Sequence, residues 1–424
     1  MTPVRGSDGT QPAVVTTRGT DHDDAGPTRR LRVLNVAMST PELRAGGAER
    51  AGLQLGDHLA AYVDVDNAKM AATHDEDLVT ELELTGAFVT VPSRTWLRGL
   101  WNRVHSSSKN YSNTVVWSDL RDLDLDEYDL VHVHNSVPMA GMVRVALACK
   151  RRGVPYVVTT HEVSSISALP TSMEMSLLPR VAFEVAVHRP YWTVLRHARH
   201  LFALSADDAA RLRARLPGQS VSVVPNGVRL RPPEPDAADR VTERWGIPAD
   251  RRVLLFVGQL STSKGVGDLL AAYDALETAC TLVVVGPVKE PAYRERLESY
   301  DDTQVRYLGY VGYPELGTLF QRADVFVFPT RSDVFPLVTL EAMAAGTAVV
   351  ATTVGGIPDQ LAGEAGVLVP PERPDRVAEC VDQLLTDDAY RASVAARGFE
   401  RVEREYSWDG VARRVAETYE TLCR

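Results

Sequence analysis

Eight short apolar runs recur along this chain, and within them apolar residues do not alternate with polar ones. Runs of this kind, rich in Val and Leu, are typical of parallel strands that helices cover on both faces. Segments with helical periodicity lie between the runs, for example at 48–61, 207–215, 267–276 and 314–322. The repeated strand–helix order predicts an α/β fold with doubly wound parallel sheets. The predicted strands are residues 31–38, 130–134, 156–160, 201–205, 253–257, 282–285, 324–328 and 348–352.

The strand–helix pattern occurs twice, and a length of 424 residues is too great for one ordinary core. The segment 231–239 contains Pro233, Pro235 and several charges, which is typical of a linker. We therefore expect an N-terminal Rossmann-like domain over 31–230 and a C-terminal one over 231–405, facing each other across a cleft. Ligands of such sheets bind at the carboxyl ends of the strands, so functional residues should follow strands.

The composition excludes several classes of protein. A net charge of −10 argues against wide nucleic-acid binding. The four cysteines lie far apart without a CxxC pair, which indicates reduced cytoplasmic thiols rather than a zinc site or disulfides. Residues 1–30 are polar, so we expect a disordered tail and no signal peptide. No stretch approaches the roughly 18 uninterrupted apolar residues of a membrane span.

The most informative segment reads TRSDVFPLVTLEAMAAG, from Thr330 to Gly346. Asp333 stands just before a predicted helix start, and Glu341 lies eight positions further on, inside that helix. A helix start presents unpaired backbone N–H groups and a positive dipole end, so it can hold a diphosphate. One carboxylate beside that site and another within reach of a diol would suit a nucleotide-sugar. The alternative is that Asp333 only caps the helix and Glu341 is an exposed acid.

Three further candidates follow predicted strands. Lys264, in GQLSTSKGV, is one of only five lysines and would place a compact charge on phosphate, although the loop is not a Walker A motif. His161 ends the strand PYVVTTH and could exchange a hydrogen bond with a sugar hydroxyl, or be purely structural. The pair Gly46-Gly47 would let a ligand approach the backbone closely, or form a plain flexible loop.

Other patterns carry weaker signals. HEVSS is not HExxH, and His132 and His134 share one strand face, where packing is favoured over metal binding. The acids of 122–129 have DxD spacing, but they precede a strand, which favours a solvated loop over a cation site. Residues 92–117 mix basic residues with tryptophan. They could contact a membrane surface or a polyanionic acceptor, or cover the acceptor side.

Together these pieces resemble the retaining, nucleotide-sugar-dependent glycosyltransferases of the GT-B fold, in the family-four group (glycosyl transferases group 1). The resemblance extends through nearly the whole chain from Leu31, and 323–346 is its most specific part. It also implies that a final helix over 406–424 crosses back onto the first domain. The matching segments are GGAER at 46–50, DLVHVHN at 129–135, VVTTHE at 157–162, VPNGV at 224–228, GQLSTSKG at 258–265, ADVFVFPTRSDVFPLVTLEAMAAG at 323–346 and YSWDGVARRVAETYETL at 406–422.

The resemblance implies roles for particular residues. The family pattern E-x7-E falls on Asp333, which would stabilise positive charge on the donor sugar, and on Glu341, which would bind the ribose diol. Lys264 would hold the donor diphosphate and His161 a sugar hydroxyl. Gly47 would let the diphosphate and acceptor come close. The remaining donor-binding positions are Gln259 and the segment of Phe335, Pro336, Leu337 and Val338, whose backbone amides would help to hold the diphosphate.

The chain departs from the family pattern at three positions. The usual arginine of the G-R-L-x3-K-G loop is Gln259, so one charge contact to the diphosphate is missing. The first glutamate is Asp333, about one methylene shorter. The usual glycine after the phenylalanine is Pro336, which has no N–H to donate. The identity of the donor sugar therefore cannot be inferred from the family.

We predict an enzyme that moves a sugar from a nucleoside diphosphate to a hydroxyl acceptor with retained configuration. Its acceptor would be a natural product, a lipid carrier or a glycan. Neither a cofactor nor a metal is expected, because fixed positive groups would stabilise the leaving diphosphate. Two alternatives stay open: a sugar-nucleotide epimerase or hydrolase of the same fold, and a non-catalytic subunit that only binds the nucleotide-sugar.

Overall fold

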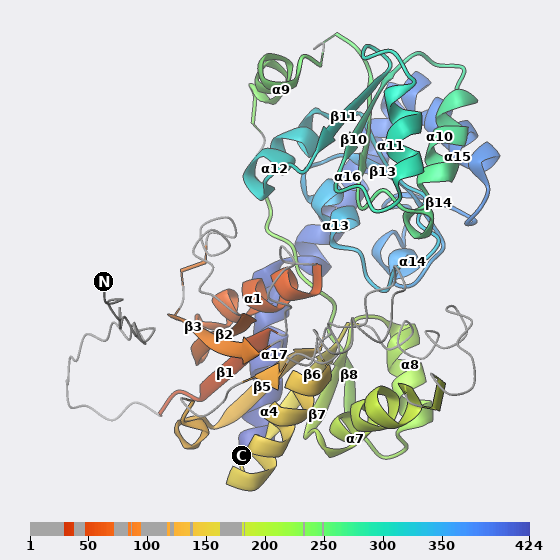
Figure 1. The fold of residues 1–424 in the computed structure, drawn as a ribbon. Coiled ribbons are helices and arrows are strands. Elements are labelled where there is room, and N and C mark those ends of the chain that lie inside the picture. The colour runs from red at the N-terminus through yellow and green to blue at the C-terminus, as the bar shows by residue number, and fades with distance from the viewer. Residues whose placement is uncertain are drawn as a thin grey trace, which may run out of the picture.

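The computed structural model has two α/β lobes (Figure 1). The predicted tail over 1–30 lies almost entirely outside the described residues, and so does most of the basic, tryptophan-containing segment 92–117. Among the helices that are described, none combines the length and apolar composition needed to span a bilayer. The structure describes residues 29–37, 47–71, 84–85, 87–94, 117–118, 123–135, 139–161, 180–181, 183–231, 234–247 and 250–424.

The N-terminal lobe contains an eight-stranded sheet in the order β4-β3-β2-β1-β5-β6-β7-β8. Its neighbouring strands pair in parallel except β3 and β4, which pair antiparallel. The strands are β1 (Arg32–Ala37), β2 (Asp64–Ala71), β3 (Ala87–Arg94), β4 (Trp117–Ser118), β5 (Leu130–Asn135), β6 (Tyr156–Thr160), β7 (His200–Ala203) and β8 (Val221–Val223). The helical segments are α1 (Gly47–Leu59), η2 (Leu125–Glu127), α4 (Met139–Arg152), η3 (Glu184–His188), α7 (Arg189–His197) and α8 (Ala206–Arg215).

The C-terminal lobe contains a six-stranded parallel sheet in the order β11-β10-β9-β12-β13-β14. The strands are β9 (Val253–Val257), β10 (Thr281–Val285), β11 (Val305–Gly309), β12 (Val325–Phe328), β13 (Ala348–Thr352) and β14 (Val367–Val369). The helical segments are α9 (Ala237–Trp245), η4 (Thr262–Lys264), α10 (Val266–Asp274), α11 (Pro291–Glu298), α12 (Tyr313–Arg322), α13 (Leu337–Ala344), α14 (Ile357–Gln360), α15 (Pro374–Thr386), α16 (Asp388–Arg401) and η5 (Val402–Tyr406). The chain then returns to the N-terminal lobe as α17 (Trp408–Cys423).

The prediction of two doubly wound parallel sheets is confirmed, and all eight predicted strands exist. Sequence analysis missed six strands, namely β2, β3, β4, β8, β11 and β14. Four of them, β4, β8, β11 and β14, are the outer strands of the two sheets. Edge strands are covered less completely, so they need no continuous Val and Leu run. The missed β2 reads DVDNAKMA, whose polar residues hide it from a search for such runs.

The last helix of the chain, α17, lies beside α1 in the N-terminal lobe (Figure 1). Its apolar residues recur at helical spacing and form one stripe. Trp408, Val411, Val415 and Tyr419 are buried in a cluster with residues of α1 and β1. The N-terminal core is therefore completed by residues from the opposite end of the sequence.

The chain crosses between the lobes twice, and the two crossings touch. The Val228 amide donates to the Tyr406 carbonyl at 2.8 Å, and Val228 bridges to Ser407. Gly227 lies against Trp408 so closely that a Cβ there would be 2.5 Å from the indole ring and 3.0 Å from the Trp408 Cα. The two segments that connect the lobes therefore pack against each other.

We expect Gly227→Ala to lower the melting temperature, because the added methyl group forces Trp408 and its backbone to shift, at a cost of about 1–3 kcal/mol. Gly267→Ala in α10 is the matched control, since its Cβ would meet Tyr293 at an ordinary 3.5 Å. Calorimetry on both variants checks the expectation. Equal melting temperatures would show that the crossing tolerates a side chain at 227.

Candidate functional site

A cavity of about 490 Å³ lies between the two lobes. It is bordered by the carboxyl ends of β6, β9 and β12, where ligands of open α/β sheets bind. Nine of the ten predicted site residues line it, and only Glu341 does not. These nine are Gly47, His161, Gln259, Lys264, Asp333, Phe335, Pro336, Leu337 and Val338.

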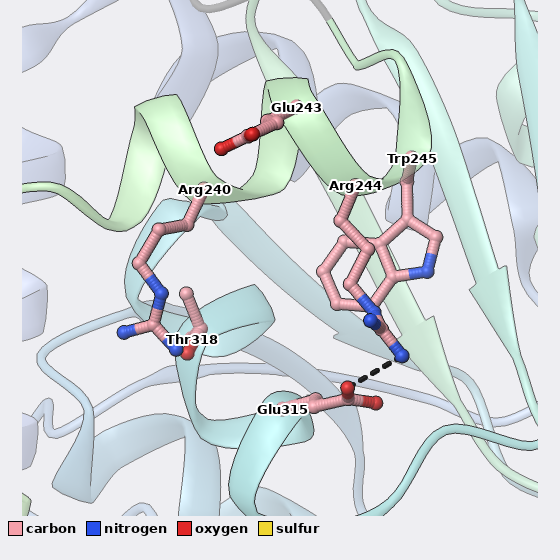
Figure 2. A pocket seen from close by; sticks show the side chains of 6 residues that line it. All are labelled: Arg240, Glu243, Arg244, Trp245, Glu315 and Thr318. Atoms are coloured by element: carbon pink, nitrogen blue, oxygen red, sulfur yellow. Dashed lines mark ion pairs between the residues drawn. The ribbon is translucent and has the colours of Figure 1, made fainter.

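A second cavity, of about 380 Å³, lies within the C-terminal lobe between α9 and α12 (Figure 2). Arg244 reaches from α9 to Glu315 on α12, where the two form an ion pair at 2.5 Å. Arg240 is likewise paired, with Glu234. None of the predicted site residues lines this cavity, so the space between the lobes is the candidate site.

The loop that carries Lys264 is held against the segment that carries Asp333. The Ser263 carbonyl accepts hydrogen bonds from the Arg331 amide at 2.9 Å and the Thr330 hydroxyl at 3.1 Å. Gly265 adopts φ +70°, and a Cβ there would be 1.8 Å from the Pro329 carbonyl oxygen, so only glycine fits. The contact brings together two candidates that are 69 residues apart in the sequence.

Lys264 and Asp333 form an ion pair at 2.6 Å in the wall of the cavity. The ammonium also lies 5.7 Å from the centre of the Phe328 ring. An ammonium has three N–H donors, so Lys264 can keep Asp333 and still bind a second anion. The alternative that Asp333 caps the next helix is wrong, because Pro336 is the N-cap residue of α13 and no side chain caps it.

The start of α13 opens on the cavity through Pro336, Leu337 and Val338. The Pro336 carbonyl accepts hydrogen bonds from the buried Thr339 hydroxyl and the Gln360 amide, both at 2.9 Å, which fix the turn. No acidic side chain stands in the first turn. The N–H groups and positive dipole end of α13 are therefore available to an anion in the cavity.

Glu341 lies on α13 one turn inside this helix start, and it is buried, with 8% of its surface exposed. The alternative that it is an exposed helical acid is therefore wrong. Its Oε1 is ion-paired with Arg50, which comes from α1 in the other lobe. Its Oε2 is buried and has no hydrogen-bond partner in the part of the chain that the structure describes. A buried carboxylate oxygen of this kind favours a hydroxyl donor from a ligand.

Arg50 is a site residue that sequence reasoning missed. It lines the cavity, and its guanidinium lies 4.9 Å from the centre of the Tyr313 ring. Burial disfavours its charge, but Glu341 and Tyr313 outweigh this effect and raise the pKa of Arg50 above its usual value. Its place in GGAER, one helical turn after Gly47, was the available signal.

His161 follows β6 and is 6% exposed. Burial lowers the pKa of His161 to about 4, so its imidazole is neutral near pH 7. His132 and His134 are also buried, and His132 contacts Tyr419 at 2.5 Å and Thr159 at 2.7 Å. Within the described residues, no group of three or more His, Cys, Asp or Glu side chains is arranged to hold a metal ion.

The sequence matches those of known glycosyltransferases. The sequence model of glycosyltransferase family 4 matches residues 45–231, and that of glycosyl transferases group 1 matches 251–387. The alpha-maltose-1-phosphate synthase of Mycolicibacterium smegmatis is 30% identical over 92% of this chain and 99% of its own. A D-inositol 3-phosphate glycosyltransferase of Xylanimonas cellulosilytica is 33% identical over 69% of this chain and 72% of its own.

Two solved structures have the same fold. Sucrose-phosphate synthase from Thermosynechococcus elongatus superposes with a TM-score of 0.70 at 22% identity, covering 93% of this chain and 99% of its own. HepE from Anabaena, solved in complex with UDP-glucose, superposes with a TM-score of 0.68 at 19% identity, covering 92% of this chain and 100% of its own. The two lobes therefore have the GT-B fold. The chain belongs to the glycosyl transferases group 1 family and is a glycosyltransferase.

We expect the Arg50–Glu341 pair to show strong coupling in a double-mutant cycle of Arg50→Ala and Glu341→Ala. Either single change leaves a buried charge unpaired, so the coupling free energy should be about 1–3 kcal/mol. Urea unfolding of the four proteins measures it. The exposed pair Asp207–Arg211 on α8 serves as the control and should couple by less than about 0.5 kcal/mol. Equal coupling in both pairs would contradict the burial argument.

Proposed function

We propose that this enzyme transfers a sugar from a nucleoside diphosphate donor to a hydroxyl acceptor, with retention of the anomeric configuration. The observation that carries the proposal is the meeting of the Lys264 ammonium and the uncapped start of α13 at one cavity. The unpartnered Oε2 of the buried Glu341 lies one helical turn beyond that helix start. These three features are complementary to a diphosphate and to the neighbouring ribose diol.

The distances between these features suit a nucleotide. Glu341 lies four residues after Leu337, so about one helical turn separates the diphosphate site at the helix start from the diol site. The UDP-glucose complex of HepE, a structure of the same fold, gives a precedent for such a donor. We assign the donor to the C-terminal domain and the acceptor to the N-terminal domain. Gln259, in place of the family arginine, leaves Lys264 and the helix as the main diphosphate ligands.

The chemistry we propose is electrostatic. The bond between the anomeric carbon and the diphosphate oxygen breaks, and the acceptor oxygen bonds to that carbon on the same face. Lys264 and the N–H groups of α13 stabilise the negative charge that develops on the diphosphate. Asp333 lies beside the sugar and stabilises its positive charge. The acceptor proton passes to a leaving diphosphate oxygen, so no side chain is assigned as general base.

Two other functions predict different assay results. An epimerase or hydrolase would consume the nucleotide-sugar with no acceptor present. A binding subunit, which the replacements Gln259, Asp333 and Pro336 could favour, would bind nucleotide tightly without turnover. A thermal-shift screen with UDP-glucose, GDP-mannose and ADP-glucose, followed by nucleotide-release assays with and without acceptor alcohols, separates these cases.

We expect Lys264→Ala and Glu341→Ala each to lower kcat/KM by about 100-fold or more, which corresponds to a loss of about 3 kcal/mol of transition-state stabilisation. Lys289→Ala is the control, because Lys289 is an exposed lysine of the same domain. Steady-state kinetics on the three variants tests the roles. Near-normal turnover in both site variants would reject these assignments.

We also expect transfer to continue in excess EDTA, with the product keeping the anomeric configuration of the donor. The fixed positive groups would do the work of a divalent cation. Proton NMR of the product anomer, recorded with and without EDTA, measures both properties. An inverted anomer would rule out the retaining mechanism, and loss of activity that added Mg²⁺ restores would rule out metal independence.

A further inference from the structure

A chain of four buried polar side chains runs from the cavity into the N-terminal lobe. His161 Nε2 lies 3.5 Å from His134 Nδ1, and His134 Nε2 lies 2.8 Å from Asn35 Oδ1. Asn35 Nδ2 donates to Asn67 Oδ1 at 2.8 Å and to the Gly52 carbonyl at 2.8 Å. None of the four side chains is more than 6% exposed, so each depends on these partners.

The Gly52 carbonyl fixes the direction of every hydrogen bond in this series of four side chains. A backbone carbonyl can only accept, so the Asn35 atom that meets it is the NH₂ group, and Oδ1 is the atom that faces His134. His134 must then carry its proton on Nε2, which leaves Nδ1 as an acceptor. His161 must in turn donate from Nε2, and its Nδ1 then carries a lone pair.

Helix α1 packs closely against these four side chains and restricts their rearrangement. A Cβ at Gly52 would be 2.7 Å from the His134 ring, and a Cβ at Gly56 would be 1.8 Å from Asn67 Oδ1. Burial also lowers the pKa of His134 well below its usual value, so a second proton is disfavoured. The opposite tautomer of His134 would bring its Nε2 lone pair against that of Asn35 Oδ1 at low local dielectric.

We propose that Asn35 and His134 are positioning residues that fix the tautomer of His161, so that its Nδ1 presents a hydrogen-bond acceptor to the donor sugar. This inference rests on the proposed function, because it takes His161 as the residue that meets a sugar hydroxyl. An acceptor at this point selects a sugar with a hydroxyl group facing His161. It disfavours a carboxylate there, since a carboxylate can only accept.

The neighbouring His132 supplies a matched control. Its ring lies 4.2 Å from that of His134 and is equally buried, but its two nitrogens meet the hydroxyls of Tyr419 and Thr159. A hydroxyl can donate or accept, so this residue imposes no direction. Its replacement removes an imidazole from the same cluster without interrupting the path from Gly52 to His161.

The test is long-range proton–nitrogen NMR on ring-labelled histidine in the full chain, without any nucleotide-sugar. In the wild type and in His132→Phe, we expect His161 to be protonated on Nε2 alone. In His134→Phe, Nε2 loses its acceptor, so the Nδ1-protonated form should be populated. A wild-type His161 protonated on Nδ1 would overturn the proposal, and so would an unchanged tautomer in a folded His134→Phe.

If His134→Phe does not fold, Asn35→Ala tests the same path, and the wild-type spectrum remains decisive on its own. With the donor found by the activity screen, His134→Phe should lower kcat/KM by about 10-fold, the value of one hydrogen bond, while His132→Phe stays within about threefold. The tautomer of His161 is measured without any turnover of substrate. A failure of the proposed function therefore appears in the activity assays, and a failure of this inference appears in the spectrum.

Discussion

The ion pair between Arg50 and Glu341 joins the two lobes beside the cavity. It joins α1 to α13, two helices that both begin at the cavity. Both partners are largely buried, so the separation of the lobes would leave neither charge with its present partner. The pair also occupies only one oxygen of Glu341, and the second is buried with no hydrogen-bond partner among the described residues. One contact thus joins the two lobes and fixes the orientation of the Glu341 carboxylate.

Helix α1 connects this contact to the rest of the site. Gly47, the first residue of α1, lies close to Leu337 of α13 in the wall of the cavity, and a Cβ added at Gly47 would lie 3.9 Å from the Leu337 side chain. Arg50 follows one turn later and reaches Glu341. Gly52 and Gly56, one turn apart, let the helix lie directly on the polar chain that ends at His161. Small residues and one long cation on a single helix therefore contact both the proposed donor site and the buried polar side chains behind it.

The sequence predicted the fold well because buried parallel strands have a local signature. The eight Val and Leu runs predicted only central strands, while the polar β2, its neighbour β3 and all four outer strands were missed. Nine of ten candidate site residues share one cavity, because carboxyl strand ends meet at the same edge of a sheet. The pairing of Arg50 with Glu341 spans 291 residues and has no local pattern. The path from Asn35 to His161 likewise depends on three different strands lying side by side.

The central claim is that the cavity between the lobes binds a nucleoside diphosphate. A crystal structure of the protein with UDP, or with the nucleotide that gives the largest thermal shift, tests it most directly. We predict the diphosphate at Lys264 and the start of α13, with the ribose hydroxyls on Glu341 Oε2. A nucleotide bound elsewhere, or one whose ribose lies away from Glu341, would contradict the claim.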